Sequence, residues 1–132
     1  MPPERYPPDD PREWLNRARS NLARAGAQMP GVYLEDLCFD AQQAAEKAIK
    51  AVLIKRKGAF PYVHDLAELL SLVEASGESV PQPVRQAGRL TRFAIAHRYP
   101  GVIEPVTPQE HREALAIADG VVRWAEELIR ED

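Results

Sequence analysis

The chain has 132 residues, of which 45% are hydrophobic and 28% are charged, and its formal net charge at pH 7 is −3. These values are typical of one folded globular domain, and they exclude attraction of polyanions by bulk charge. No apolar run reaches the roughly 18 residues that a membrane span needs, and no basic-then-apolar leader opens the chain. We therefore expect no membrane association and a cytoplasmic location.

The first ten residues differ in composition from the rest. They contain four prolines, Pro2, Pro3, Pro7 and Pro8. This predicts a disordered N-terminal lead-in over residues 1–9 and a single helical domain over residues 10–132. The one cysteine, Cys38, has no internal disulfide partner and lies on the apolar face of a helical pattern, so we expect a buried, inert thiol.

The first two predicted helices are an N-terminal pair. The first begins at Asp10, and Glu13 completes a capping box. The second covers residues 32–57 and ends at Gly58. Its apolar stripe is rich in alanine, which lets neighbouring helices approach closely on two sides. Its opposite, polar face carries Gln42, Gln43, Glu46, Lys47 and Lys50.

Two shorter helices are predicted next. The third begins near Asp65 and ends before Gly77. The fourth covers residues 84–97. It must end before Pro100, because proline disfavours helical geometry in the residue that precedes it.

The last predicted helix begins at Thr107, where Glu110 completes a second capping box. Trp14 and Trp124 are expected to be core or interface anchors. No segment alternates apolar and polar residues over the length of a strand. The sequence therefore predicts an all-α fold, an antiparallel up-and-down helical bundle of four to five helices.

Residues 79–103 contain no acidic residue, although the chain as a whole is acidic. Within this segment Arg85, Arg89 and Arg92 are spaced i, i+4 and i+7, so they share one face of a regular helix. A guanidinium group holds two phosphate oxygens at once and stays charged at any biological pH. These arginines are predicted to bind phosphate. The alternative is a solvated basic face that pairs with acidic neighbours.

Arg92 and His97 are the candidate catalytic residues. They lie about 140° apart on a regular helix, so an unwound helix end or a second copy of the helix must bring them together. A histidine exchanges protons with a ribose 2′-hydroxyl near neutral pH, and an arginine neutralises charge on the reacting phosphate. The two suffice to cleave RNA without a metal ion. The alternative for His97 is an imidazole packed at a helix C-terminus.

The other two histidines are expected to be structural. His64 lies at the start of the third helix, and His111 lies in the first turn of the last helix, where we expect it to be exposed. The three histidines lack the spacing of metal ligands, and the chain has no glycine-rich phosphate loop. We therefore expect neither a metal site nor a cofactor.

Three segments together resemble the HEPN domain family. They are residues 39–51, which are similar to the family's Gln-Ala-Ala-Glu-Lys-x-x-Lys helix, His64-Asp65-Leu66 at the expected distance after it, and Arg98-Tyr99-Pro100 at the end of the fourth helix. The likeness extends over roughly residues 14–128, and it implies a helical fold.

The resemblance also implies an activity and partners. The family's signature is an arginine, four to six residues and then a histidine, and Arg92 and His97 satisfy this spacing. By resemblance they would form the catalytic site of a metal-independent endoribonuclease, in a cleft between the two protomers of a homodimer. Arg98 and Tyr99 would bind the nucleotide or phosphate beside them. Such proteins often act as toxins beside a minimal nucleotidyltransferase that serves as antitoxin.

Two other functions stay open. Active members of the family usually place a polar residue directly after the arginine, whereas Phe93 stands there, and the Arg-Tyr-Pro branch is also described as nucleotide-binding. A non-catalytic module that binds a nucleotide or the transferase is therefore one alternative. The other is a structural dimer whose arginines pair with carboxylates of the first and last helices.

Overall fold

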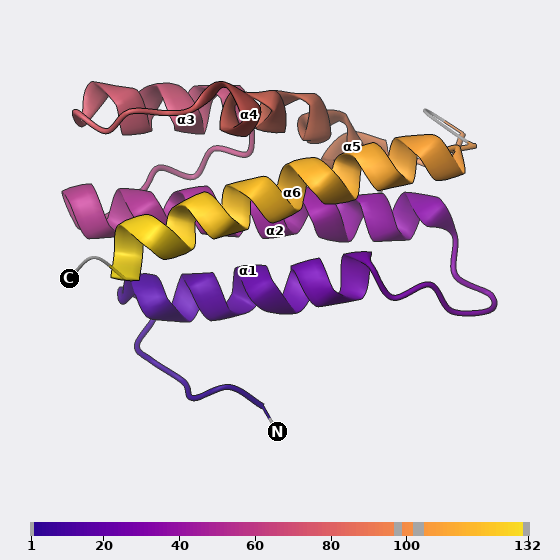
Figure 1. Cartoon of the computed structure of the whole chain (residues 1–132), viewed down its shortest axis with the longest axis horizontal. Helices are drawn as coiled ribbons and strands as arrows, with labels where there is room; N and C mark the ends of the chain where they lie inside the picture. The colour runs from indigo at the N-terminus through magenta and orange to yellow at the C-terminus, as the bar shows by residue number, and fades with distance from the viewer. Residues whose placement is uncertain (1, 97–98, 102–104, 131–132) are drawn as a thin grey trace.

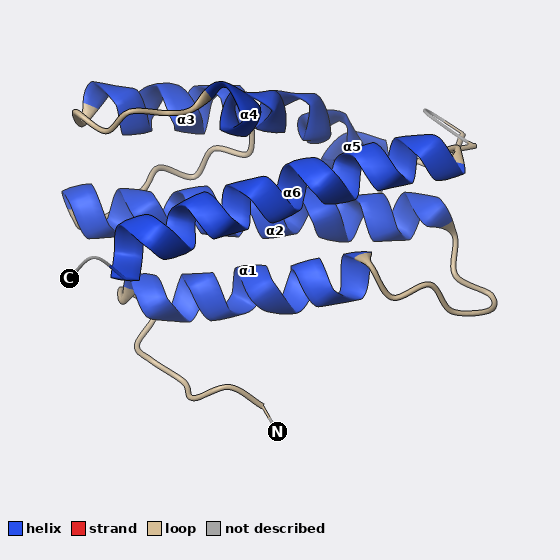
Figure 2. Cartoon of the chain, in the orientation of Figure 1, coloured by secondary structure: helices blue, strands red, loops and turns tan. Residues whose placement is uncertain are grey.

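A computed structural model describes residues 2–96, 99–101 and 105–130 of the chain. Its helices are α1 (Pro11–Ala25), α2 (Leu34–Lys57), α3 (Leu66–Ala75), α4 (Gln82–Arg85), α5 (Thr91–Ala96) and α6 (Pro108–Arg130), with a 3-10 helix, η1 (Gln86–Leu90), between α4 and α5. No strand occurs within the described residues (Figure 2). The predicted all-α helical bundle is confirmed.

The long helix α2 lies at the centre of the bundle, with α1 beside it and α6 crossing in front of it (Figure 1). Glu35, near the start of α2, accepts a hydrogen bond from the backbone N–H of Val106, just before α6. Lys55, near the end of α2, donates to the carbonyl oxygen of Leu128 near the end of α6. The helices α2 and α6 therefore run in the same direction, and α1 runs opposite to both.

The connection over residues 58–65 explains why α2 and α6 are parallel. It runs back along α2, so that His64 reaches Glu46, and α3 then follows the direction of α2 until Ser76 meets Arg56. The segment α4–η1–α5 returns the chain to the other end of the bundle, where α6 begins (Figure 1). One pair of consecutive helices is thus parallel within an otherwise up-and-down order.

The helix ends follow the predicted chemistry in part. The Thr107 hydroxyl accepts from the Glu110 N–H at 3.1 Å, and Glu110 accepts from the Thr107 N–H at 3.0 Å, so the capping box of α6 is confirmed. Gly58 ends α2 with φ of 79°, a left-handed conformation that glycine adopts without strain. The predicted capping box at the start of α1 is not formed, so that prediction is wrong. Asp10 caps the helix, but Glu13 accepts from the backbone N–H of Tyr6.

The N-terminal lead-in lies against α1. The indole N–H of Trp14 donates to the carbonyl oxygen of Pro8 at 2.7 Å, and the Asn16 amide donates to that of Glu4 at 2.8 Å. Residues 2–9 contain no helix. The division into a disordered lead-in over residues 1–9 and one domain over residues 10–132 stays a prediction.

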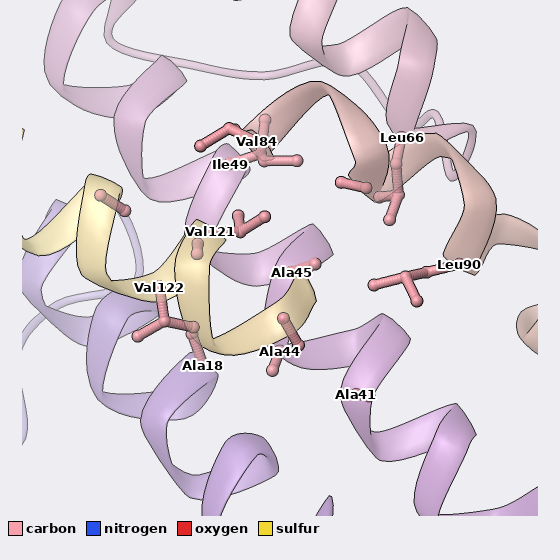
Figure 3. Packing of buried hydrophobic residues seen from close by; sticks show 14 of the residues in the cluster. Ala18, Ala41, Ala44, Ala45, Ile49, Leu66, Val84, Leu90, Val121 and Val122 are labelled. Carbon is pink, nitrogen blue, oxygen red and sulfur yellow. The ribbon is translucent and has the colours of Figure 1, made fainter. Parts of the chain in front are cut away.

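The core forms where α2 contacts α1, α6 and the α4–η1 segment. Figure 3 shows Ala44 and Ala45 of α2 close to Val121 of α6, with Ala18 of α1 near Val122. The three alanines of the predicted stripe on α2, Ala41, Ala45 and Ala48, are fully buried, as are Ala44 and Ala51. Small side chains on the central helix let two neighbours pack directly on it, as the sequence predicted.

Cys38 extends this stripe toward the start of α2 and is also fully buried. Burial raises the pKa of its thiol to about 12. The predicted buried, unreactive cysteine is confirmed.

The fourth helical segment is not the continuous helix that we predicted over residues 84–97. Residues 86–90 form a 3-10 turn, in which Gly88 lies so near α3 that a Cβ atom there would be 3.4 Å from the Cβ of Ala67. A 3-10 helix turns by roughly 120° per residue instead of roughly 100°. This rotates Arg85 away from the face that carries Arg89.

None of the helices described here combines the length and the apolar character that a membrane span requires.

Candidate functional site

Arg92 lies in the first turn of α5 and faces the start of α6. Its guanidinium NH2 is 3.4 Å from Oε2 of Glu110, and its Cζ is 4.6 Å from the centre of the Phe93 ring. The Arg92 side chain is 49% exposed, whereas Phe93 is buried. Phe93 therefore packs in the core and anchors α5 there. Its ring contacts the guanidinium group of Arg92, which stays exposed to solvent.

Glu110 performs two tasks at this site. One carboxylate oxygen closes the capping box of α6, and the other approaches Arg92. Hydrogen bonds from the Thr107 backbone and side chain, together with the nearby charge of Arg92, hold the pKa of Glu110 below its usual value. The carboxylate is thus ionised at neutral pH and fixed in position by the helix start.

The other two arginines of the predicted basic face have carboxylate partners as well. Arg89 lies 3.3 Å from Glu113 of α6, one turn beyond Glu110. Arg85 instead pairs with Glu74 of α3. The three arginines therefore do not share one face, because the 3-10 turn separates Arg85 from the other two. This corrects the α-helical spacing that we assumed.

The remaining predicted site residues follow α5 in the sequence. His97 and Arg98 fall outside the described residues. Tyr99 is described and is 60% exposed. Ile95, in the last turn of α5, is 56% exposed, so two large apolar side chains face solvent close to Arg92 in the sequence.

The surface around Arg92 is shallow in a single chain. A depression of about 10 Å³ lies between α5 and α6 and is lined by Arg89, Arg92, Glu110 and Glu113. That volume is about the room one water molecule needs. The described residues therefore offer an exposed guanidinium at Arg92 but no enclosed pocket of nucleotide size around it.

The larger grooves lie elsewhere. One of about 550 Å³ separates α1 from α6, but its charged side chains pair with each other, as in Arg19 with Glu126 and Arg123 with Asp119. Another, of about 530 Å³, is lined by Trp14 and Phe60 at the end of α2. Neither contains a predicted site residue, so size alone does not identify the site.

Comparison with known proteins decides the family. A family model described as the HEPN domain matches residues 11–128, which include every described helix except the last two residues of α6. The chain belongs to the HEPN domain family. Among curated proteins no match was found.

Two solved structures are similar to this HEPN domain over most of their length. TT1696 from Thermus thermophilus is 33% identical with a TM-score of 0.75, and the match covers 89% of this chain and 97% of that one. ST0689, an archaeal HEPN homologue, is 27% identical with a TM-score of 0.69, and the match covers 91% and 98%. Both matches cover about nine tenths of this chain, so the structural similarity includes the whole helical bundle.

Three polar residues of α2 within the HEPN motif, Gln42, Glu46 and Lys50, are buried. Glu46 accepts hydrogen bonds from Gln42 and Lys50, both at 2.8 Å, and contacts Nδ1 of His64 at 2.9 Å. Burial alone would raise the pKa of Glu46, but these hydrogen bonds outweigh it and lower the pKa. The spacing i, i+4 and i+8 of Gln42, Glu46 and Lys50 was the signal in the sequence that this network forms along one line of the helix.

His111 also differs from its predicted exposed position. It is buried at 3% exposure, and its Nε2 donates to the carbonyl oxygen of Ala25 at 2.7 Å. The contact ties the start of α6 to the end of α1 in this HEPN domain. Asp65 caps α3 by accepting from the Ala67 N–H, so the structural role predicted for that helix start is confirmed.

Among the described residues, no three or more histidine, cysteine, aspartate or glutamate side chains are grouped so that they could hold a metal ion.

Proposed function

We propose that this HEPN domain is a metal-independent endoribonuclease, the toxin-like subunit of a two-component system with a minimal nucleotidyltransferase. The observation that carries the proposal is the exposed guanidinium of Arg92, held on the surface by Glu110 and Phe93 five residues before His97. The family assignment supports it, since the Arg92–His97 spacing matches the family's signature.

The ion pair with Glu110 does not prevent Arg92 from binding RNA. Exposed ion pairs are worth about 0–1 kcal/mol, whereas hydrogen bonds to a charged group such as a phosphate are worth about 1.5–3 kcal/mol each. The guanidinium therefore exchanges the carboxylate for a phosphate when RNA arrives. Glu110 then serves to keep Arg92 extended and oriented in the free protein.

In the proposed reaction the imidazole of His97 takes the proton from a ribose 2′-hydroxyl. The 2′ oxygen bonds to phosphorus, the bond to the 5′ oxygen breaks, and that oxygen takes a proton from water, while His97 afterwards returns its proton to the solvent. Arg92 neutralises the negative charge that grows on the phosphate oxygens. Arg89, Arg98 and Tyr99 hold the flanking phosphate and nucleotide.

The test is cleavage of RNA by the purified protein in excess chelator. Arg92→Gln is expected to lower the rate by roughly 100-fold or more, as removal of a stabilising donor does. The matched control is Arg123→Gln, which removes the same charge from an exposed ion pair on α6. Equal activity of the two variants would show that Arg92 has no catalytic role.

The proposed assembly is a homodimer, because the described residues of one chain form only a shallow depression at Arg92. Exposed apolar side chains gather at that end of the bundle, where α2 begins and α5 ends. They are Met29, Val32, Tyr33, Ile95 and Tyr99. A second protomer packed there would bury them and build walls around Arg92. The cytoplasmic location inferred from the sequence belongs to the same proposal.

A second candidate function is a non-catalytic module that binds a nucleotide or the transferase. The apolar Phe93 beside Arg92 favours it, because active members of the family usually place a polar residue directly after the arginine. Calorimetry with nucleotides and co-purification with a transferase test it. Binding without cleavage would favour this module over the nuclease.

A further inference from the structure

Lys47 is a half-buried cation that has no carboxylate within ion-pair distance among the described residues. It projects from the middle of α2 toward α1, and its Nζ makes a single hydrogen bond, to Oδ1 of Asn21 at 2.7 Å. Within the described part of the chain no carboxylate lies within ion-pair distance of Lys47. An ammonium group has three donors, so two of them remain available to a ligand.

The partner Asn21 is fixed in orientation. It is buried, and its amide NH₂ group donates to Oδ1 of Asp40 at 3.0 Å, so its oxygen must face Lys47. Asp40 is buried too and also pairs with Arg24 at 3.0 Å. The position of the ammonium group is therefore set by a rigid network that links α1 to α2.

Two arginines of α1 lie on either side of Asn21 along the same face of the helix. Arg17 uses only its Nε, which donates to Glu13 at 2.7 Å, and both of its terminal nitrogens are unbonded in the described structure. Arg24 uses one terminal nitrogen for Asp40. Their side chains are 55% and 68% exposed, so the unused donors are accessible.

The charges at this surface do not cancel. Glu13 pairs with Arg17 and Asp40 pairs with Arg24, whereas Asp40 and Glu46 act on Lys47 only from beyond ion-pair distance. Burial, and then the charges of Arg17 and Arg24, lower the pKa of Lys47. By contrast, each of the three arginines near α5 has its own glutamate. The unbalanced positive charge therefore lies between α1 and α2.

We propose that Lys47, with Arg17 and Arg24, forms a binding site for a phosphate group on the α1–α2 surface. A phosphate oxygen would take the free donors of Lys47, and the planar forks of the arginines would take the others. An anion there supplies the missing negative charge and relieves the repulsion among the three cations. A nucleotide and an RNA strand both carry this group. The site does not depend on the nuclease proposal, because it lies on different helices from Arg92.

The test uses inorganic pyrophosphate, titrated into the full-length protein by calorimetry and by amide NMR. We expect the amide signals of residues 17–24 and 43–50 to shift. Lys47→Met should weaken binding roughly tenfold or more, since the loss of one charge-assisted hydrogen bond is worth at least about 1.4 kcal/mol. Lys57→Met is the matched control, because Lys57 is an exposed lysine at the end of the same helix.

Three results would overturn the proposal: no binding by the wild-type protein, equal loss of affinity in both variants, or shifts confined to residues 85–96. A thermal melt separates loss of binding from loss of folding. Pyrophosphate should raise the midpoint of the wild-type protein and of Lys57→Met but not of Lys47→Met.

Competition then distinguishes the source of the phosphate. Displacement of pyrophosphate by a short RNA at the same amides supports an RNA backbone, and displacement by ADP alone supports a nucleotide. Displacement by neither would contradict the assignment to a phosphate ester.

Discussion

At the scale of single residues, Glu46 is a buried carboxylate with three side-chain partners. It is 5% exposed, accepts hydrogen bonds from Gln42 and Lys50, and contacts the imidazole of His64. A buried ion pair contributes little net stability when intact, but the loss of one partner leaves an uncompensated charge. The fold therefore tolerates Lys50 in its interior only because Glu46 is ionised.

Glu46→Gln should accordingly lower the free energy of unfolding at pH 7 by about 3–5 kcal/mol. The double variant Glu46→Gln/Lys50→Met should recover part of that loss, since it removes both charges. Urea unfolding measures both. Glu68→Gln, at an exposed position on α3, is the control and should change stability by less than about 0.5 kcal/mol.

The same side chain predicts an acid dependence of stability. The pKa of Glu46 is lowered in the folded protein, so the unfolded chain binds a proton more readily as the pH falls below about 4.5, the ordinary value of a glutamate. Its contribution is complete above that pH and is lost as the pH falls through the lowered pKa. The double variant should therefore lose less stability between pH 5 and pH 3 than the wild-type protein. An equal loss in both would show that Glu46 is not a source of the acid sensitivity.

At the scale of elements, the start of α6 combines stability with the candidate site. The capping box fixes Glu110, and Glu110 in turn holds Arg92. A helix cap of this kind is worth about 1 kcal/mol. The element that begins the last helix thus also sets the direction of the proposed catalytic guanidinium.

Thr107→Ala should therefore lower the free energy of unfolding by about 1 kcal/mol, because the N–H of Glu110 loses its acceptor. Ser71→Ala is the control. Its hydroxyl donates to a backbone carbonyl inside α3, so its loss should cost less than about 0.5 kcal/mol. Denaturant midpoints of the two variants that agree within error would contradict the capping role of Thr107.

The elements also show which parts of the fold the sequence predicts. The alanine stripe of α2 and the Thr107–Glu110 box are local patterns, and both have the structure expected of them. The 3-10 turn at residues 86–90 is set by the close approach of Gly88 to α3, a tertiary contact that helical spacing does not encode. The assumed common face of the three arginines was wrong for this reason.

The burial of His111 is the other feature that the sequence did not predict. His111 was placed at the surface because of its side-chain type, yet it is buried, and its hydrogen-bond partner, the carbonyl oxygen of Ala25, is far away in sequence. Such partners become visible only when the helices are assembled. The candidate residues themselves, Arg92 and Tyr99, are exposed, and His97 and Arg98 lie outside the described residues.

At the scale of the whole molecule, the exposed large apolar side chains are distributed unevenly between the two ends of the bundle. The end at which α2 begins carries most of the exposed large apolar side chains, whereas Tyr62 lies near the opposite end, after α2. In the proposed dimer the first end is covered by a second copy. The proposed active site is then complete only in the assembly.

Ile95→Asp should therefore convert the dimer to a monomer, because it places a charge in an apolar interface. Light scattering coupled to size-exclusion chromatography measures the mass. Tyr62→Asp makes the same kind of change at a side chain that is 95% exposed, and it should leave the dimer intact. A wild-type protein that is monomeric at every concentration would refute the proposed assembly.

The most direct test of the central claim concerns His97. Purified wild-type protein should cleave RNA in excess chelator, and His97→Ala should be slower by roughly 10²–10⁴-fold while it keeps the wild-type unfolding midpoint and the dimer mass. Cleavage at the wild-type rate by the His97→Ala protein would contradict the account.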